Sequence, residues 1–464
     1  MPPEISDQFC RAATHSQLDR YVNPPKERAM ISHTFSRIRP PLVAVATWTL
    51  VVATSGCWTR ALIDTKGSGG TSGGPGGVFH PVVAPITDPG KLDVLFMVDN
   101  SQSMAPLQAK LQAAIPGFIN GLTDPTTGKL PNLHVAVITS SFGGGAWANV
   151  NQCGAGSHPG DDRGFFQQGP NGAGSGSCAM LHPGETYLDT GDGVTTPPNF
   201  DGDIRDALKC TAYVGDGGCG FESQFESTYY ALYLASQPKG TAEQENLQNG
   251  GFLRPEARLA IIMLTNEDDC SVASDSLLLS PAVNSVMDPS GLGALSSYRC
   301  NEFGHLCAGS PPPHTAPPAG GVTLTACVSA ENNGKVDSNV RDPLGNPDPT
   351  RGHLWPTVAD FTDYIKGFKA NPNDVFVAAI AGPPTPYRVI PAINAAAMGE
   401  TDPAVEHSCT QATTGDPEYA DPAVRIKQWV DNFGANGAFY PICADSMQGT
   451  MEGISAAIHT RLGS

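Results

Sequence analysis

Charge of either sign is scarce in this sequence, and basic charge is the scarcer. Charged residues make up 16% of the 464 residues, well under the roughly 25% of an average globular domain. The chain has 45 acidic and 27 basic residues, which leaves a net charge of −18. A nucleic-acid binder needs a basic face to neutralise phosphates, so the balance argues against that class. It also argues against docking on an anionic lipid surface through charge.

The short motifs of common enzyme classes are also missing. The histidines show no His-Glu-x-x-His spacing, and no Gly-x-Ser-x-Gly elbow lies between a predicted strand and a predicted helix. The glycines at 143–145 follow a predicted strand, but no Lys-Ser/Thr pair follows them, so they do not form a phosphate-binding loop. We therefore predict that the protein is not an enzyme.

Closely spaced cysteine pairs are absent, although the chain has twelve cysteines. Without a Cys-x-x-Cys pair, zinc-ribbon and thioredoxin-like interpretations lose their usual signal. Cysteines scattered through glycine-rich loops favour an oxidising compartment and disulfide bonds. The first pairings that we expect are local, Cys153–Cys178 and Cys210–Cys219. The disulfide candidates are Cys153, Cys178, Cys210, Cys219, Cys270, Cys300, Cys307, Cys327, Cys409 and Cys443.

The N-terminal residues 1–56 have the features of an export signal. Residues 41–53 carry no charge; the stretch is shorter than the ~20 apolar residues of a membrane span but fits the core of a signal peptide. The segment that follows ends in Ser55-Gly56-Cys57 and resembles a bacterial lipobox, with Thr54 where leucine is usual. We expect residues 1–56 to be an N-terminal extension and lipoprotein signal peptide, Met30 to be a candidate true start, and Cys57 to be lipidated. Ordinary signal cleavage and an internal hydrophobic segment are the alternatives.

Residues 57–88 follow as a tether, and the folded domain is expected at 89–464. The tether is rich in glycine and serine, a composition that cannot pack a core. Because Trp58 and not aspartate follows Cys57, we expect an outer-membrane lipoprotein that faces the surface or the periplasm. Contact with the membrane would then be through the lipid anchor alone.

Hydrophobic periodicity in the domain predicts strands that alternate with helices. Such alternation is typical of an α/β fold with a doubly wound, mostly parallel sheet. One further strand should lie within 160–200, with Phe165–Phe166 as its best candidate. Strands are predicted at 91–98, 133–139, 259–265, 375–380 and 438–442, and helices at 104–122, 221–235, 358–368, 422–433 and in a terminal segment through Leu462.

Two long insertions interrupt this pattern, at about residues 141–202 and 270–355. Loops of this length without regular structure are usually functional or disordered. Their cysteines favour the first interpretation, since a cross-link lowers the entropy of the unfolded loop. Both insertions follow a predicted strand, so both should project from the edge of the sheet where those strands end.

Asp99, Ser101 and Ser103 form a D-x-S-x-S motif directly after the first predicted strand. Loops at the carboxyl ends of parallel strands are where open α/β sheets bind ligands, and carboxylate and hydroxyl oxygens suit a hard divalent cation. With a single carboxylate the ion stays under-neutralised, so an open coordination position can accept a carboxylate from a partner. A simple turn or helix cap is the alternative. In this position the motif resembles the start of the metal-ion-dependent adhesion site of a von Willebrand factor type A (vWA) domain.

The resemblance implies two further motifs, and both deviate here. A threonine is implied in the loop 214–220, which has none; Asp216 is the oxygen ligand available there, unless it is a turn residue. An aspartate is implied where Asn266 stands, and its amide oxygen adds no charge. The resemblance therefore implies one Mg²⁺ or Mn²⁺ ion, bound more weakly than at a complete site. Glu267, Asp268 and Asp269 either restore the negative field or form a solvated acidic loop with Cys270 as a disulfide anchor.

Several further segments resemble, more narrowly, the cysteine-rich vWA lipoproteins of myxobacteria. This resemblance implies a cell-surface lipoprotein that displays a vWA domain for divalent-metal-dependent adhesion or for binding a protein ligand that offers an acidic side chain. A structural surface lipoprotein with a degenerate metal site is the first alternative, and a metal-dependent hydrolase acting through residues 267–269 is a less favoured one. The resemblance covers residues 90–463 and rests on the segments 218–222, 252–255, 267–271, 298–304 and 442–443.

Overall fold

The computed structural model describes residues 90–144, 147, 150, 153, 162–169, 178, 180–237, 249–272, 276–282, 292–330, 353–394, 400–412 and 418–462. The predicted signal peptide, the predicted lipidation site Cys57 and the tether lie outside these residues. Within the described part of the chain, no helix is both long enough and apolar enough to span a membrane.

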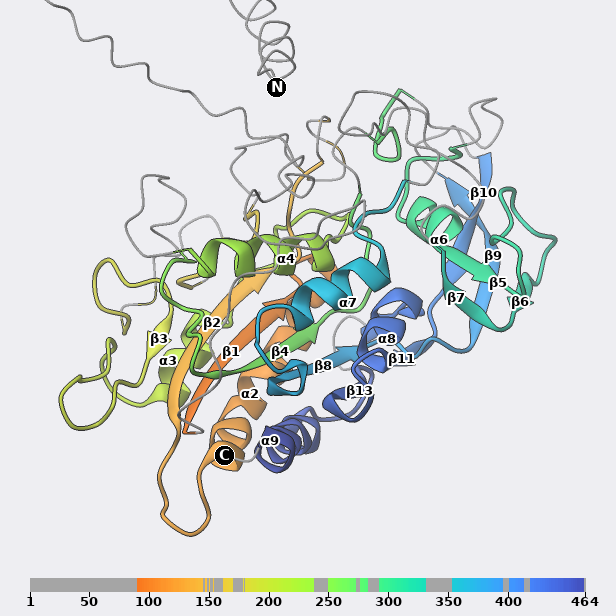
Figure 1. Ribbon diagram of the computed structural model, residues 1–464. Coiled ribbons are helices and arrows are strands. Elements are labelled where there is room, and N and C mark those ends of the chain that lie inside the picture. Colours follow the sequence, from red (N-terminus) through yellow and green to blue (C-terminus); the bar gives the residue numbers. More distant parts are fainter. Residues whose placement is uncertain are drawn as a thin grey trace, which may run out of the picture. The chain divides into compact units, whose positions relative to one another are not determined.

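A six-stranded sheet forms the centre of the fold, and five of its strands run parallel (Figure 1). β1 pairs with β2 on one side and with β4 on the other, and all three strands are buried over nearly their whole length. The structure therefore has the predicted α/β architecture with a largely parallel sheet. The order across the sheet is β13 (Gly437–Pro441), β8 (Val375–Ala381), β4 (Arg258–Leu264), β1 (Lys91–Val98), β2 (Asn132–Thr139) and β3 (Leu188–Asp189).

Helices cover both faces of this sheet, because successive side chains of each strand point to opposite faces. On β1, Phe96 and Val98 pack into one core, and Leu95 and Met97 pack into the other. The first core is closed by α2 (Ala105–Leu122), α3 (Ile204–Thr211) and α9 (Gln448–Leu462). The second is closed by α4 (Gln224–Ala235), α7 (Val358–Lys366) and α8 (Val424–Asp431) (Figure 1).

The edge strand beside β2 lies within 160–200 as predicted, but its expected place at Phe165–Phe166 is wrong. β3 consists of Leu188–Asp189 and runs antiparallel to β2. Phe166 instead gives its backbone N–H to the side chain of Asn249 at 3.1 Å. Its ring is buried against that of Phe252, with centroids 5.0 Å apart. The segment still contacts β2, because Gln167 N–H donates to the Val137 carbonyl at 2.8 Å, but residues 165–166 form no strand.

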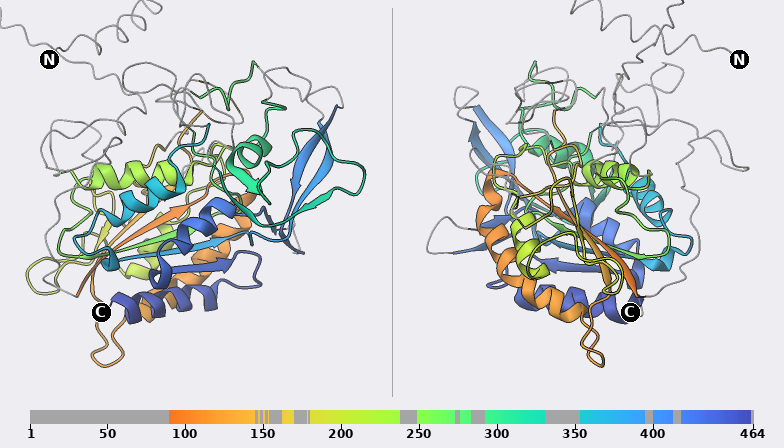
Figure 2. Two further views of the ribbon diagram at one scale, coloured as in Figure 1. Left: turned by 45° about the vertical axis from the view of Figure 1, so that its right-hand side comes forward. Right: turned by 90° about the vertical axis from the view of Figure 1, so that its left-hand side faces the viewer.

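The second predicted insertion contains short elements of its own, and a third insertion at 382–421 was not predicted. The second holds α6 (Tyr298–Gly304), β5 (His305–Cys307), β6 (Val322–Leu324) and β7 (Cys327–Ser329). The third follows β8 and holds β9 (Tyr387–Asn394), β10 (Glu400–Glu406), β11 (Cys409–Gln411) and β12 (Glu418–Ala420). β6 pairs with β9, so the two insertions share one small sheet beyond the central one (Figure 2).

Five disulfides involve all ten of the predicted cysteines, but both of the expected local pairings are wrong. The bonds are Cys153–Cys219, Cys178–Cys210, Cys270–Cys300, Cys307–Cys327 and Cys409–Cys443. The Cys219 backbone N–H donates to the Ser141 hydroxyl at 3.1 Å. Ser141 lies just past the end of β2, so this bond holds Cys219 beside the segment that leads to Cys153. Cys178 precedes Leu181, which packs in the same core as α3, the helix that carries Cys210. Disulfides in this number are consistent with an exported or extracellular protein.

Candidate metal centre

Asp99 lies at the carboxyl edge of the sheet, where β1 ends between β2 and β4. Its carboxylate is fully buried. Oδ1 accepts hydrogen bonds from the Ser101 backbone N–H at 2.8 Å and from the Ser140 hydroxyl at 3.0 Å, and Oδ2 accepts one from the Thr265 hydroxyl at 2.7 Å. Burial raises the pKa of Asp99, and the hydrogen bonds from Ser101, Thr265 and Ser140 oppose that rise. The parallel pairing of the three strands thus brings Ser101, Ser140 and Thr265, which follow β1, β2 and β4, to the carboxylate of Asp99.

The serines of the motif and Asn266 meet beside this carboxylate. Ser101 Oγ lies 3.4 Å from Ser103 Oγ. Ser103 Oγ in turn lies 3.0 Å from Asn266 Nδ2 and 3.3 Å from Asn266 Oδ1. A short 3₁₀ turn, Gln102–Met104, places Ser103 opposite the residue that follows Thr265. The structure therefore gathers four of the five predicted ligands.

Asp216, the fifth predicted ligand, is exposed to solvent. Its loop is attached to the site through backbone atoms instead. Gln108 Nε2 donates to the Gly215 carbonyl at 2.7 Å and to the Asp99 carbonyl at 2.9 Å. This anchoring leaves the Asp216 side chain facing water, which favours the turn interpretation over the ligand interpretation.

Asp268 does not belong to a solvated loop, because it is buried and paired. Its Oδ2 lies 2.9 Å from His305 Nε2 and accepts the backbone N–H of Arg425 at 2.8 Å, while Oδ1 accepts that of Ile426 at 3.1 Å. Arg425 and Ile426 are in the first turn of α8, whose free N–H groups favour a carboxylate. Burial alone would raise the pKa of Asp268, but the His305 contact and these bonds hold it below its ordinary value.

Asp269 joins the same buried group through the side chain of Arg425. Its Oδ2 lies 3.1 Å from the Arg425 guanidinium, and its Oδ1 accepts the Phe225 backbone N–H at 2.8 Å, in the first turn of α4. Cys270 follows at once and is bonded to Cys300 of α6. Asp268 and Asp269 therefore tie α4, α8 and the second insertion together, and they are not free to restore a negative field at Asp99.

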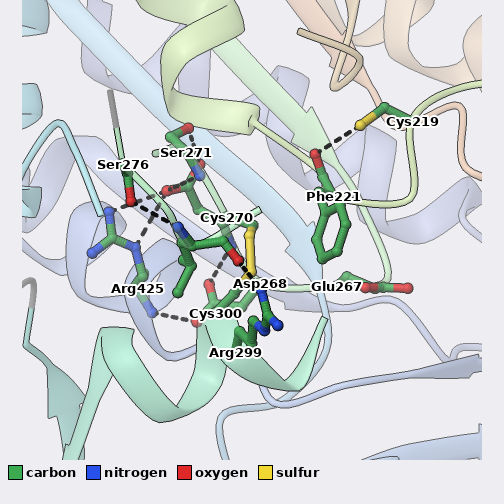
Figure 3. The surroundings of a disulfide bond; sticks show 12 residues. Cys219, Phe221, Glu267, Asp268, Cys270, Ser271, Ser276, Arg299, Cys300 and Arg425 are labelled. Carbon is green, nitrogen blue, oxygen red and sulfur yellow. Dashed lines mark hydrogen bonds and ion pairs between the residues drawn. A yellow bond between two sulfur atoms is a disulfide. The ribbon is translucent and has the colours of Figure 1, made fainter. Parts of the chain in front are cut away.

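Glu267 and Glu222 are acidic side chains near Asp99, and the two share a side-chain hydrogen bond. The Glu267 side chain lies apart from the Arg425 group (Figure 3). Burial raises its pKa, and the nearby charges of Asp421 and Asp99 raise it further. Glu222 is 1% exposed; burial raises its pKa well above the ordinary value, and the charges of Glu267 and Asp99 add to that rise. Sequence reasoning missed Glu222, although it lies in the segment 218–222 that carries the family resemblance.

The third insertion also reaches this edge of the sheet. Asn266 Nδ2 donates to the Tyr419 carbonyl at 3.2 Å, and Asp421 N–H donates to the Asn266 carbonyl at 2.8 Å. The Tyr419 ring stacks on His407, with centroids 4.0 Å apart, and His407 Nδ1 lies 2.7 Å from Asp421 Oδ1. No sequence pattern linked this hairpin to Asp99, because the contact joins segments far apart in the chain.

The chemistry of the centre fits a hard cation better than a soft one. Its donors are carboxylate, hydroxyl and amide oxygens, which Mg²⁺, Mn²⁺ and Ca²⁺ prefer. Glu222 Oε1 is buried and has no hydrogen-bond partner in the described part of the protein, which leaves this oxygen available to a cation or a water molecule. Among the described residues there is, however, no group of three or more His, Cys, Asp or Glu side chains placed to hold a metal ion. A cation here would therefore depend on the serine hydroxyls as well.

Comparison with known proteins adds little to this picture. No family model and no curated protein matches the chain. Among solved structures, the chain is similar to the pilus adhesin SpaC from Lactobacillus rhamnosus GG, at 10% sequence identity and a TM-score of 0.29. The match covers 82% of this chain and 31% of the adhesin, so the chain spans about a third of that protein's length. A TM-score this low does not establish a common fold.

Proposed function

We propose that this protein is an exported binding module of the vWA type that captures a protein ligand through a divalent cation. The cation, Mg²⁺ or Mn²⁺, would be held by Asp99, Ser101 and Ser103, with Asn266 beside them. One observation carries the proposal. Ser103 and Asn266 are 163 positions apart in sequence, yet their side chains touch, directly beside the buried carboxylate of Asp99.

The chain's own residues provide what such binding needs. Asp99 is held in place by Ser140 and Thr265, which limits its motion and orients its oxygens. Ser101 and Ser103 offer hydroxyl oxygens from the loop after β1, and Ser103 is partly open to solvent. A bound divalent cation supplies Lewis acidity and an open coordination position. An acidic side chain of the partner would complete the coordination there, and the chain's negative surface would otherwise repel such a group.

The export part of the proposal is supported by the disulfides and by the N-terminal sequence pattern. Attachment to the outer membrane would be through lipidated Cys57. The hydrolase alternative loses support, because two of its three acidic residues are buried and already bonded, Asp268 to His305 and Asp269 to Arg425. The degenerate-site alternative keeps one observation in its favour. Both oxygens of Asp99 already accept hydrogen bonds within the protein, so the carboxylate is satisfied without a cation.

Calorimetric titration of the mature protein with Mg²⁺ and Mn²⁺ tests the proposal. The parent should bind one ion, and its melting temperature should rise with the ion, because a ligand that binds only the folded state stabilises that state. Asp99→Ala should abolish both effects. Asp206→Asn, an exposed change of the same charge on α3, is the control and should behave as the parent. A parent that ignores millimolar Mg²⁺ and Mn²⁺ would favour the degenerate-site alternative, and a pull-down of surface proteins with and without chelator would then show no difference.

A further inference from the structure

Glu222 is a buried carboxyl whose bonding is incomplete. Only 1% of the residue is exposed. Its Oε1 is buried without any hydrogen-bond partner among the described residues, although the carboxyl group as a whole shares a side-chain hydrogen bond with Glu267. Glu222 is in no ion pair within the described ranges. The charged neighbours that affect its pKa are two other acids, Glu267 and Asp99. Buried polar atoms are almost always bonded, and buried carboxylates are usually paired or coordinate a metal.

The backbone around Glu222 places it against the edge of the sheet that carries Asp99. Ser223 N–H donates to the Ser140 carbonyl at 2.8 Å, and the Ser140 hydroxyl donates to Asp99 at 3.0 Å. On the other side, Cys270 N–H donates to the Glu222 carbonyl at 2.8 Å, just past the loop of Asn266. The backbone of Glu222 therefore lies between the loops that follow β2 and β4. The electrostatic coupling of its carboxyl to both Asp99 and Glu267 agrees with that position.

Resting on the cation site proposed above, we infer that Glu222 is a direct ligand of the divalent cation and supplies the second carboxylate that Asn266 lacks. Asp99 and Glu222 together balance the two charges of the ion, and the ion gives Glu222 Oε1 the partner that the protein does not. A hard divalent cation prefers carboxylate oxygen, so the residue type fits. The loop between α3 and α4 thus contributes Glu222, where sequence reasoning had placed Asp216.

This assignment changes the expected strength of the site. The asparagine at 266 implied weak binding because it removes a negative charge. With Glu222 in the coordination sphere the charge is restored from another loop. Binding should then depend on Glu222 as well as on Asp99, and it should not depend on the exposed Asp216.

The decisive experiment compares the parent with Glu222→Gln, Asp216→Asn and the control Asp206→Asn. Mn²⁺ and Mg²⁺ affinity is measured by calorimetry, and melting temperature is measured with and without the ion. Glu222→Gln should lose about tenfold or more in affinity, since even residues that only orient metal ligands affect affinity this much. Without the ion, the same variant should melt at the parent's temperature or above it, because the change removes a buried carboxyl beside Glu267 and Asp99. Asp216→Asn and Asp206→Asn should match the parent in both measurements.

Each other outcome has a definite meaning. If the parent binds the ion and Glu222→Gln binds it equally well, Glu222 is not a ligand, and the proposed function still stands. Loss of affinity in Asp216→Asn instead would assign the ligand to that residue and overturn the inference. If ion-free Glu222→Gln melts well below the parent, the carboxyl serves the fold, and the inference is again wrong. A parent that binds no divalent ion refutes the proposed function itself.

Discussion

The side-chain amide of Asn266 donates a hydrogen bond to the main-chain carbonyl of Tyr419, with 3.2 Å between Nδ2 and O. An aspartate, which the vWA resemblance implies at this position, has no N–H and could not make that bond when ionised. Tyr419 belongs to β12, in the insertion after β8. The asparagine therefore has a structural role here, because its amide joins the candidate metal centre to the hairpin of β11 and β12.

Asn266→Asp should separate these two roles of the residue. Without a divalent cation, the free energy of unfolding should fall by about 1–3 kcal/mol, the usual cost of leaving a buried polar group unbonded. With Mg²⁺ or Mn²⁺, the variant should show a larger rise in melting temperature than the parent, because it adds a negative charge beside the ion. Urea unfolding with and without the ion measures both. Equal stability of the two ion-free proteins would show that the bond to Tyr419 contributes nothing.

Removal of the disulfide Cys409–Cys443 should destabilise the protein and weaken the candidate metal centre. The bond spans 34 residues of chain and holds β11 of the hairpin that contacts Asn266. Replacing both cysteines with serine should cost about 3–4 kcal/mol by loop-closure entropy. The matched control is the double serine variant at Cys307–Cys327, which spans 20 residues in the second insertion. It should lose similar stability but keep its affinity for the cation; equal affinity in both variants would contradict a role of the hairpin at the site.

Arg425→Met should be one of the most damaging single changes to the fold. The guanidinium lies 3.1 Å from Asp269, and both side chains are fully buried. Breaking a buried ion pair from one side costs about 3–5 kcal/mol, because the other charge is left unpaired. Lys427→Met on the same helix breaks the partly exposed pair with Asp431 and should cost under about 0.5 kcal/mol. Chemical denaturation of both variants tests the difference, and similar losses would refute the structural role of Asp269.

The pairing of β3 with β2 should weaken in acid. Burial would raise the pKa of Asp189, but the hydrogen bond with His134 and that from Gly191 hold it below its ordinary value of 3.8. A lowered carboxyl pKa stabilises the folded state above the unfolded value and loses that contribution as the pH falls below it. The parent should therefore lose more stability than Asp189→Asn when the pH is lowered from 5 to about 3. Parallel pH profiles of the two proteins would show that Asp189 does not contribute.

Cys57→Ser tests the export proposal without any reference to the fold. If Cys57 carries the lipid, the variant should leave the membrane fraction or fail to mature. Fractionation of cells that produce the parent and the variant measures this. Unchanged membrane partitioning, together with a mature N-terminus at another residue, would refute the lipoprotein assignment.

Patterns within short stretches of sequence were enough to predict the central sheet and the place of the D-x-S-x-S motif. Residues 91–98 form a nearly continuous apolar run, and β1 spans Lys91–Val98. A strand buried on both faces has such a run wherever its neighbours lie, so the pattern can be read without knowing them. Because Asp99 directly follows that run, its place at the carboxyl edge of the sheet followed as well.

Contacts between distant segments were decided only by the tertiary structure. The sequence shows that Cys153 and Cys219 are cysteines, but it does not show that the chain beyond β2 brings them together. It shows Glu222 as one acid among 45 acidic residues, whereas the structure buries it between two loops beside Asp99. The contact between Asn266 and the hairpin of β11 and β12 also joins segments far apart in the sequence. Such contacts depend on which loops meet in space after the sheet has formed, and a loop has no periodicity from which its neighbours can be predicted.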